Sequence, residues 1–329
     1  MKINYFFRHP NNGHSIHRVF RTLISNLDKS FEIAIFEVPC EGSMPGNVIK
    51  NFIYTYDKRD KLAIHHVTGH IHDVLLALIG TKTVLTVHDL VFLDNVKNPF
   101  KRFYKWLFWL YLPIKIADKV VCISNQTKNN ILSKIKTDKL MVIHNAIDPI
   151  FTHVVRPFNQ KKPVILHIGT GWNKNLKRTI QALEGISCHL RIIGRLQDSQ
   201  IRLLTKHQVE YSNQFDLTDM DIKNEYINCD IVNFPSLYEG FGMPVIEGQQ
   251  TGRVVVTSNI EPLLEVAGEA AAFVNPKEIN SIREAYISVI ENVAFRNTLI
   301  EKGLQNAKRF SVVNIAQQYA DLYQNLSKK

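Results

Sequence analysis

The sequence predicts an α/β protein that contains two doubly wound, mostly parallel β-sheets. Short apolar runs alternate with longer amphipathic segments, this alternation occurs in two sets, and a stretch with three prolines lies between the sets. Alternating strands and helices favour a parallel sheet with helices on both faces. At 329 residues, the chain is long enough for two domains of ordinary size.

Each set of apolar runs predicts six strands. In the first set we expect strands at Ile3–Phe7, Glu32–Phe36, Leu62–His66, Thr83–Val87, Lys119–Ile123 and Lys139–Ile143. In the second set we expect them at Val164–Ile168, Leu190–Ile193, Val209–Tyr211, Ile231–Phe234, Val254–Thr257 and Ala272–Val274. Helical segments fall between most of these runs, so each set predicts one Rossmann-like domain.

The boundary between the domains is expected at Asp148 to Pro163, because three prolines fall there and a fresh strand follows. We therefore predict an N-terminal domain at residues 1–148, a linker at 149–162 and a C-terminal domain at 163–311. Residues 312–329 have apolar positions at helical spacing and predict a final helix. Ligands of such sheets bind beyond the carboxyl ends of the strands, so we expect the site in a cleft between the domains.

Composition narrows the class of protein. An apolar fraction of 45% excludes general disorder, and a net charge of +10 favours anionic partners such as phosphorylated substrates, anionic lipid or nucleic acid. The four cysteines are scattered without metal-ligand spacing, which makes a reducing cytoplasm the expected location. We expect neither a signal peptide nor a membrane-spanning segment, because the first apolar run is short and no run of about 18 apolar residues occurs.

The most informative segment is Pro235–Glu247, with the sequence PSLYEGFGMPVIE. It follows an apolar strand and predicts a tight glycine loop at Gly240 and Gly242, then a helix with Pro244 in its first turn. Exposed amides at a helix N-terminus bind phosphate well. Glu239 and Glu247 suit hydroxyl groups instead, so the segment predicts a ligand with a diphosphate between two hydroxylated rings.

This segment resembles the E-x7-E signature of the retaining family 4 glycosyltransferases, which have the GT-B fold. The resemblance implies two Rossmann-like domains that face a cleft, with the final helix packed back on the first domain. It also implies that Glu239 holds hydroxyls of the transferred sugar and that Glu247 holds the ribose. The remaining donor contacts are expected from the loop and helix start, at Gly240, Phe241, Gly242, Met243 and Pro244.

A second phosphate loop is predicted after the first strand of the C-terminal domain. The segment Val164–Leu176 reads VILHIGTGWNKNL, in which Lys174 matches a lysine that holds the donor diphosphate in the family. Gly169 and Thr170 are expected to contact the donor as well. The arginine usual in this family is absent, since Thr170 stands near its place, and Arg195 after the next strand is a candidate replacement.

Two further candidates come from the N-terminal domain. Thr86–Leu90 reads TVHDL and resembles a family segment whose histidine lies beside the transferred sugar, so we expect a catalytic role for His88 alongside Glu239. The first glycine loop resembles the family's N-terminal loop and makes Gly13 and His14 candidates for contact with phosphate or acceptor. Because this loop departs from the family pattern, a simple turn and helix cap is the alternative.

The resemblance implies no cofactor and no metal. The pair Asp219 and Asp221 could bind a divalent metal, but both precede a predicted helix, where acidic residues stabilise the N-terminus. We expect the helix-capping role and metal-independent chemistry.

The segment from Lys97 to Lys115 interleaves aromatic and basic residues. This composition suits the interface of an anionic membrane and a polyprenyl-diphosphate-linked acceptor. Apolar residues occupy nearly every face of the predicted helix, so a core role is the alternative.

The predicted function is transfer of a sugar from a UDP- or GDP-linked donor to a hydroxyl of a glycan or lipid-linked acceptor, with retention at the anomeric carbon. Surface-polysaccharide or lipopolysaccharide synthesis is the expected setting. A nucleotide-sugar epimerase or hydrolase on the same fold is one alternative. A basic nucleic-acid-binding protein is another, but the sequence has neither a recognition helix nor an aromatic and basic sheet face. We therefore expect no nucleic-acid partner.

Overall fold

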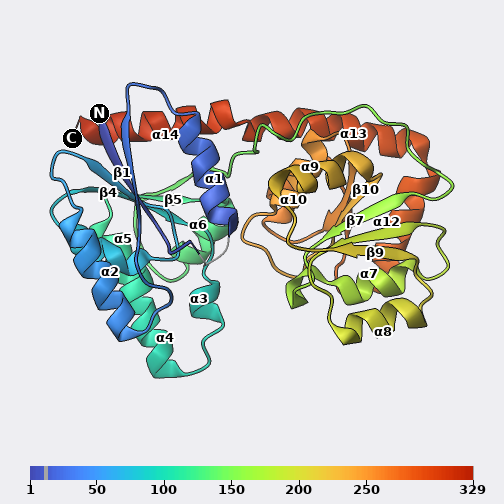
Figure 1. Ribbon diagram of the computed structural model, residues 1–329, viewed down its shortest axis with the longest axis horizontal. Helices are drawn as coiled ribbons and strands as arrows, with labels where there is room; N and C mark the ends of the chain where they lie inside the picture. Colours follow the sequence, from blue (N-terminus) through green and yellow to red (C-terminus); the bar gives the residue numbers. More distant parts are fainter. Residues whose placement is uncertain (11–13, 329) are drawn as a thin grey trace. The chain divides into compact units, whose positions relative to one another are not determined.

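The computed structural model describes residues 1–10 and 14–328, with the backbone alone for His14 and Ser15. The chain forms two compact units (Figure 1). Unit 1 comprises Met1–Ala146 and Val312–Lys329, and unit 2 comprises Ile147–Ser311.

Unit 1 has a parallel sheet in the order β2-β1-β3-β4-β5-β6 within its described residues. Its strands are β1 (Lys2–Phe7), β2 (Glu32–Glu37), β3 (Ile64–Val67), β4 (Lys82–Val87), β5 (Lys119–Cys122) and β6 (Leu140–Val142). The helical elements between them are α1 (His14–Ser25), α2 (Pro45–Asp57), η1 (His72–Leu78), α3 (Val91–Asp94), α4 (Pro99–Lys105), η2 (Trp106–Tyr111), α5 (Leu112–Ile116) and α6 (Asn125–Leu132).

The final helix, α14 (Val312–Ser327), completes unit 1 although it follows unit 2 in sequence. It lies beside α1 (Figure 1) and buries an apolar face that includes Ile315, Tyr319 and Leu326. Polar groups also join it to the sheet. The hydroxyl of Tyr323 lies 2.7 Å from the hydroxyl of Tyr5 and 2.6 Å from Nδ1 of His66, all three being buried.

Unit 2 has a second parallel sheet, in the order β12-β11-β10-β7-β8-β9. Its strands are β7 (Val164–Ile168), β8 (His189–Ile193), β9 (Tyr211–Gln214), β10 (Ile231–Phe234), β11 (Val254–Ser258) and β12 (Ala272–Val274). The helical elements are η3 (Trp172–Lys174), α7 (Leu176–Leu183), α8 (Asp198–Lys206), α9 (Asp219–Asn228), α10 (Met243–Gln250), α11 (Leu263–Ala267), α12 (Ile279–Glu291), α13 (Val293–Ala307) and η4 (Lys308–Phe310). Helix α12 packs against α7, and α13 packs against α10.

The predicted pair of parallel, doubly wound sheets is confirmed. Central strands such as β10 and β11 are buried along their whole length, as expected of a sheet covered on both faces. Strand β3 is shifted from the expected Leu62–His66 to Ile64–Val67. The strand expected at Val209–Tyr211 is displaced further, since β9 begins at Tyr211. The cause is the end of α8, where the amide of Val209 still donates to the carbonyl of Leu204 and Gln208 has a positive φ of 50°.

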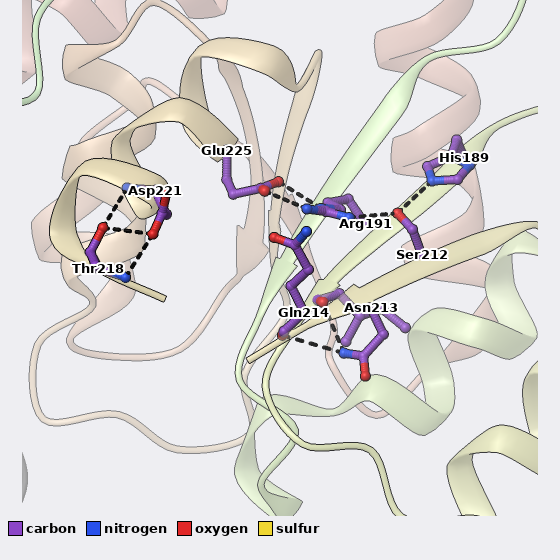
Figure 2. A network of polar contacts seen from close by, with 9 residues as sticks. His189, Arg191, Ser212, Asn213, Gln214, Thr218, Asp221 and Glu225 are labelled. Carbon is purple, nitrogen blue, oxygen red and sulfur yellow. Dashed lines mark hydrogen bonds and ion pairs between the residues drawn. The ribbon is translucent and has the colours of Figure 1, made fainter. Parts of the chain in front are cut away.

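Helix α9 is tied to the edge of the unit 2 sheet by a polar network (Figure 2). Arg191 of β8 donates two hydrogen bonds to the Glu225 carboxylate of α9, at 2.7 and 2.5 Å, and a third to Ser212 of β9 at 3.1 Å. Asp221 caps the helix, because its Oδ2 accepts from the amide and hydroxyl of Thr218 at 3.0 and 2.6 Å. The expected capping role of this acidic residue is confirmed.

No helix in the described part of the chain is both long and apolar enough to span a membrane.

The contact between α14 and the sheet gives a stability prediction. Replacing Tyr323→Phe removes the one hydroxyl that serves both Tyr5 and His66, and it leaves buried polar groups short of a partner. We expect the free energy of unfolding to fall by about 1–3 kcal/mol in chemical denaturation. Tyr56→Phe is the control, because Tyr56 is 49% exposed and its loss should cost less than about 0.5 kcal/mol. Equal, small effects in both variants would contradict this role for α14.

Candidate functional site

The predicted glycine loop and helix start are formed by the connection from β10 to α10. Gly242 is the N-cap of α10 with a φ of 115°, and a Cβ there would lie 2.5 Å from Cδ2 of Leu263, so only glycine fits. Pro244 lies in the first turn, and the first amide that donates back is that of Val245, to the Gly242 carbonyl at 3.0 Å. The amide of Met243 therefore precedes the first hydrogen bond within the helix. An amide in this position can donate to a bound anion.

The second predicted loop connects β7 to α7. Gly169 has a φ of 91°, and a Cβ at this position would lie 2.9 Å from Cγ of Lys174, so the glycine makes room for the lysine side chain. The Thr170 hydroxyl donates to the carbonyl of Arg195 at 2.7 Å. Asn175 has a left-handed φ of 62°, and its Nδ2 donates to the carbonyls of Pro235 and Pro276.

An ion pair joins these two loops. Nζ of Lys174 lies 2.6 Å from Oε1 of Glu239, and the two side chains are only 23% and 12% exposed. The ammonium group also lies over the ring of Phe234, 4.6 Å from its centroid. Next to the pair, the carbonyl of Asn173 accepts from the amide of Leu237 at 2.8 Å, and its Nδ2 donates to the carbonyl of Tyr238 at 3.1 Å.

This arrangement places a cation, a carboxylate and a helix N-terminus at the carboxyl ends of the neighbouring strands β7 and β10. The cation and the amides suit a phosphate group, while the carboxylate accepts hydrogen bonds from hydroxyls. Sequence positions 174 and 239 are 65 residues apart, and the structure brings their side chains together as one polar group.

Glu247, the second glutamate of the signature, lies deeper than Glu239. Its side chain is 3% exposed, and its Oε2 accepts a hydrogen bond from the hydroxyl of Tyr226 at 2.6 Å. Tyr226 is itself fully buried on α9. The carboxylate is thus held in one orientation.

Arg195, the candidate for the missing arginine, has partners of its own in this structure. Its guanidinium pairs with the carboxylate of Asp216 and lies over the ring of Phe215, 4.6 Å from the centroid. The side chain is 71% exposed. To contact a phosphate beside Lys174, it would have to leave both partners.

Phe241, in the loop between β10 and α10, is an anchor within unit 2. Its ring is 4% exposed and meets Phe310 edge-on at 5.8 Å between centroids. This contact fixes the loop that carries Gly240 and Gly242.

His88 lies in unit 1, just after β4. Its Nε2 lies 2.8 Å from the carbonyl oxygen of Thr68, which can only accept, so this nitrogen carries the proton. Burial lowers the pKa of His88 to about 3, and the nearby His70 contributes in the same direction. The imidazole is therefore neutral at pH 7, and Nδ1 is its remaining hydrogen-bond acceptor.

The remaining two candidates belong to the first glycine loop. Gly13 lies outside the described residues. His14 is described by its backbone alone, as the first residue of α1.

Sequence reasoning missed several residues that shape the site. Asn173 and Asn175 flank Lys174 in the same segment. For Asn175 a signal was available, because asparagine tolerates a left-handed φ better than most non-glycine residues. Tyr226 and Phe234 carried no such signal, because their roles depend on contacts between distant segments.

Comparisons with known proteins fit this geometry. The family described as "Glycosyl transferases group 1" matches residues 151–306, and "Glycosyltransferase Family 4" matches residues 44–151. Together the two matches run without a gap from residue 44 to residue 306. The chain belongs to the family 4 glycosyltransferases. The predicted family membership is thereby confirmed.

Curated relatives of this glycosyltransferase include enzymes named for O-antigen synthesis. The O-antigen chain mannosyltransferase RfbU of Salmonella typhimurium is 25% identical over 257 residues, covering 74% of this chain and 69% of the relative. The serotype-specific mannosyltransferase WbdA of Escherichia coli is 26% identical over 266 residues, covering 71% of this chain but 32% of the relative. The chain thus spans only about a third of the length of WbdA.

Solved structures confirm the GT-B fold. Sucrose-phosphate synthase from Thermosynechococcus elongatus superposes with a TM-score of 0.79 at 16% identity and covers 99% of both chains. HepE of Anabaena, solved with UDP-glucose, superposes with a TM-score of 0.77 at 15% identity, covering 99% of this chain and 100% of HepE.

The ion pair between the loops can be measured by a double-mutant cycle of Lys174→Met and Glu239→Gln. Because both side chains are mostly buried, we expect a coupling free energy of about 1–2 kcal/mol in denaturation without nucleotide. The control is Lys302 with Glu269, which are 3.0 Å apart but 49% and 89% exposed, and this pair should give less than about 0.5 kcal/mol. Coupling at 174 and 239 no larger than in the control would show that the pair does not join the loops.

Proposed function

We propose that this protein transfers a sugar from a nucleoside diphosphate to a hydroxyl of a glycan or lipid-linked acceptor, with retention at the anomeric carbon. The observation that carries the proposal is the 2.6 Å contact between Lys174 and Glu239 beside the N-terminus of α10. It joins a cation that can bind phosphate to a carboxylate that can bind hydroxyls within one unit. A nucleotide sugar carries both kinds of group, a diphosphate and sugar hydroxyls.

The leaving nucleoside diphosphate develops negative charge as the sugar departs. The Lys174 ammonium and the amides around Gly242 and Met243 stabilise that charge, and their fixed positions avoid reorganisation during the reaction. When the donor binds, the Lys174 ammonium contacts the diphosphate and gives up part of its contact with Glu239. The freed carboxylate oxygen accepts hydrogen bonds from hydroxyls of the transferred sugar.

Glu247 and His88 have supporting roles in this scheme. Glu247, oriented by Tyr226, accepts hydrogen bonds from the ribose hydroxyls. His88 meets the transferred sugar as a hydrogen-bond acceptor at Nδ1, because its other ring nitrogen donates to Thr68.

Retention can arise in two ways. Double displacement needs a carboxylate nucleophile on the far face of the sugar, and the candidate carboxylates Glu239 and Glu247 are already assigned to hydroxyl binding. We therefore infer attack from the front face, in which a donor phosphate oxygen accepts the proton of the acceptor hydroxyl. No metal takes part in this scheme.

The setting we propose is surface-polysaccharide or lipopolysaccharide synthesis in the cytoplasm. The names of the O-antigen relatives support it, and the UDP-glucose bound to HepE supports a nucleotide-sugar donor. Mannosyl transfer from a GDP-linked donor is the first candidate, and UDP-linked donors are the second. An epimerase or hydrolase on the same fold would release nucleotide without an acceptor.

Contact with the inner face of an anionic membrane is part of the proposal. In the segment Lys97–Lys115, Phe100 is 85% exposed and Phe103 is 61% exposed, and both lie on α4 with Lys101 and Arg102. Trp109 and Leu110 of the same segment are buried, so the alternative core role applies to its second half. Exposed aromatics beside basic residues are typical of helices that lie in the headgroup region.

The donor contacts are tested by Lys174→Ala, Glu239→Ala and Glu247→Ala. The first two are expected to lower transfer by at least a hundredfold, because each removes about 3 kcal/mol of transition-state stabilisation. Glu247→Ala should mainly weaken donor binding in calorimetry. Lys302→Ala, on the surface of unit 2, is the control. Near-normal turnover of the Lys174 variant would show that the phosphate contact is misassigned.

The donor base is identified by thermal shift with UDP, GDP and ADP and their sugars, with and without EDTA. We expect one of the uridine or guanosine nucleotides to raise the melting temperature, and EDTA to leave that shift unchanged. Loss of the shift in EDTA would contradict metal-independent binding.

Membrane contact is tested by flotation with vesicles that contain phosphatidylglycerol. We expect the wild-type protein to float and the double variant Phe100→Ser and Phe103→Ser to stay in the dense fraction. The control is Phe295→Ser, since Phe295 is 38% exposed on α13 of unit 2. Wild-type protein that does not float would overturn this part of the proposal.

A further inference from the structure

Unit 1 contains a cavity of about 240 Å³ that the proposed donor contacts do not use. Residues that follow three neighbouring strands line it: Arg8 after β1, Cys40 after β2 and His70 after β3. Its other walls include Asp73 of η1, Phe92 of α3, and Lys105 and Trp109 from α4 and η2.

The position of the cavity in the sheet favours a binding site. Strand β1 lies between β2 and β3 in the sheet. The connection from β1 to β2 runs to one side of β1, and the connection from β2 to β3 crosses to its other side. This reversal creates a crevice at the carboxyl ends of the strands, where ligands of open α/β sheets bind. The cavity lies at that point.

Asp73 is the most unusual group in the cavity wall. The residue is 6% exposed and forms no ion pair among the described residues, and the only described donor near its carboxyl is its own backbone amide. Burial raises the pKa of this carboxyl to about 7. A buried carboxyl whose one described donor is its own amide can accept further hydrogen bonds, so the group is suited to ligand hydroxyls.

Two cations stand elsewhere in the same wall. Arg8 and Lys105 both line the cavity, and neither forms an ion pair with Asp73. The Arg8 guanidinium also interacts with the carboxylate of Asp89. The histidine in the wall, His70, has a pKa lowered by burial and adds no charge at neutral pH. The cavity thus combines a carboxyl that can bind hydroxyls with two basic side chains.

Aromatic side chains supply the apolar part of the wall. Trp109 is 6% exposed, and its carbonyl oxygen is held by Nδ1 of the buried His72 at 2.6 Å. Phe92 packs edge-on against His72, with centroids 5.4 Å apart. The volume lies just below that of pockets for drug-sized ligands, about 300–1,000 Å³, and so suits a single ring with a small substituent.

We propose that this cavity is the subsite for the acceptor, and that it takes a sugar ring that carries an anionic group. A ring hydroxyl meets the Asp73 carboxyl, the ring lies against Trp109 and Phe92, and the anionic group meets Arg8 and Lys105. The anionic group is a phosphoryl group or a carboxyl group. This inference rests on the proposed transferase function and adds the chemical class of the acceptor to it.

The test measures binding of three probes by saturation-transfer NMR, namely mannose 1-phosphate, glucuronic acid and mannose. We expect at least one anionic sugar to bind tenfold or more tightly than mannose. A preference for mannose 1-phosphate identifies a phosphoryl-bearing acceptor, and a preference for glucuronic acid identifies a carboxyl-bearing one. Equal binding of all three probes, or no binding by either anionic sugar, would overturn the inference.

Variants locate the binding in this cavity. Asp73→Asn and Lys105→Met are expected to weaken the preferred probe at least fivefold. Lys101→Met is the matched control, because Lys101 lies on the same helix as Lys105 but does not line the cavity. Unchanged affinity in both cavity variants would place the probe elsewhere and contradict the inference.

Nucleotide binding, measured on the same samples, separates this inference from the proposed function. If UDP or GDP binds but neither anionic sugar binds, the acceptor subsite is wrong and the transferase proposal is unaffected. Failure of every nucleotide would sink the transferase proposal by itself.

Folding of the Asp73→Asn variant can be checked by its melting temperature. The pKa of Asp73 is raised in the folded protein, so the unfolded chain loses its proton first as the pH rises. Stability is therefore lost between about pH 4 and pH 7 and stays low above that range. The asparagine cannot ionise, so the variant should melt no lower than the wild type at pH 8. A much lower melting temperature would show that the carboxylate is a structural group.

Discussion

The site depends on one contact, the ion pair of Lys174 and Glu239. It joins the first loop of unit 2 to the glycine loop before α10, and the backbone of Asn173 makes a second connection at the Leu237 amide. The side chains of Asn173 and Asn175 strengthen this connection, because they donate to the carbonyls of Tyr238 and Pro235 in the second loop. With the pair in place, a cation and the amide end of a helix hold a constant separation before any ligand arrives, which is what electrostatic preorganisation requires.

Backbone geometry makes that contact possible. Glycine at 169 leaves space for the lysine stem, and glycine at 242 turns the chain where a side chain would strike Leu263. Asn175 ends the first loop in a left-handed conformation and binds two carbonyls from other connections. Backbone arrangement also creates the cavity of unit 1. The reversal of strand order opens a crevice there, and helices and aromatic side chains form its walls.

The sequence predicted most of the strands and several residues of the candidate site. The features that it did not predict share one cause. The strands followed from apolar runs, and Lys174, Gly242 and Glu239 followed from the residues around them, because these signals lie within a few neighbouring positions. The pairing of Arg195 with Asp216, the burial of Glu247 under Tyr226 and the late start of β9 did not follow. Each depends on which distant segments the folded chain brings together, and the cavity around Asp73 collects residues from eight different elements and connections in the same way.

The central claim is that the joined loops of unit 2 grip the donor diphosphate. Hydrogen–deuterium exchange with and without the nucleotide chosen by thermal shift tests it most directly, because it reads backbone amides without altering any side chain. We predict slower exchange at residues 169–175 and 240–247, with β12 unchanged as an internal reference. Protection confined to other segments, or none in either loop at saturating nucleotide, would contradict the account.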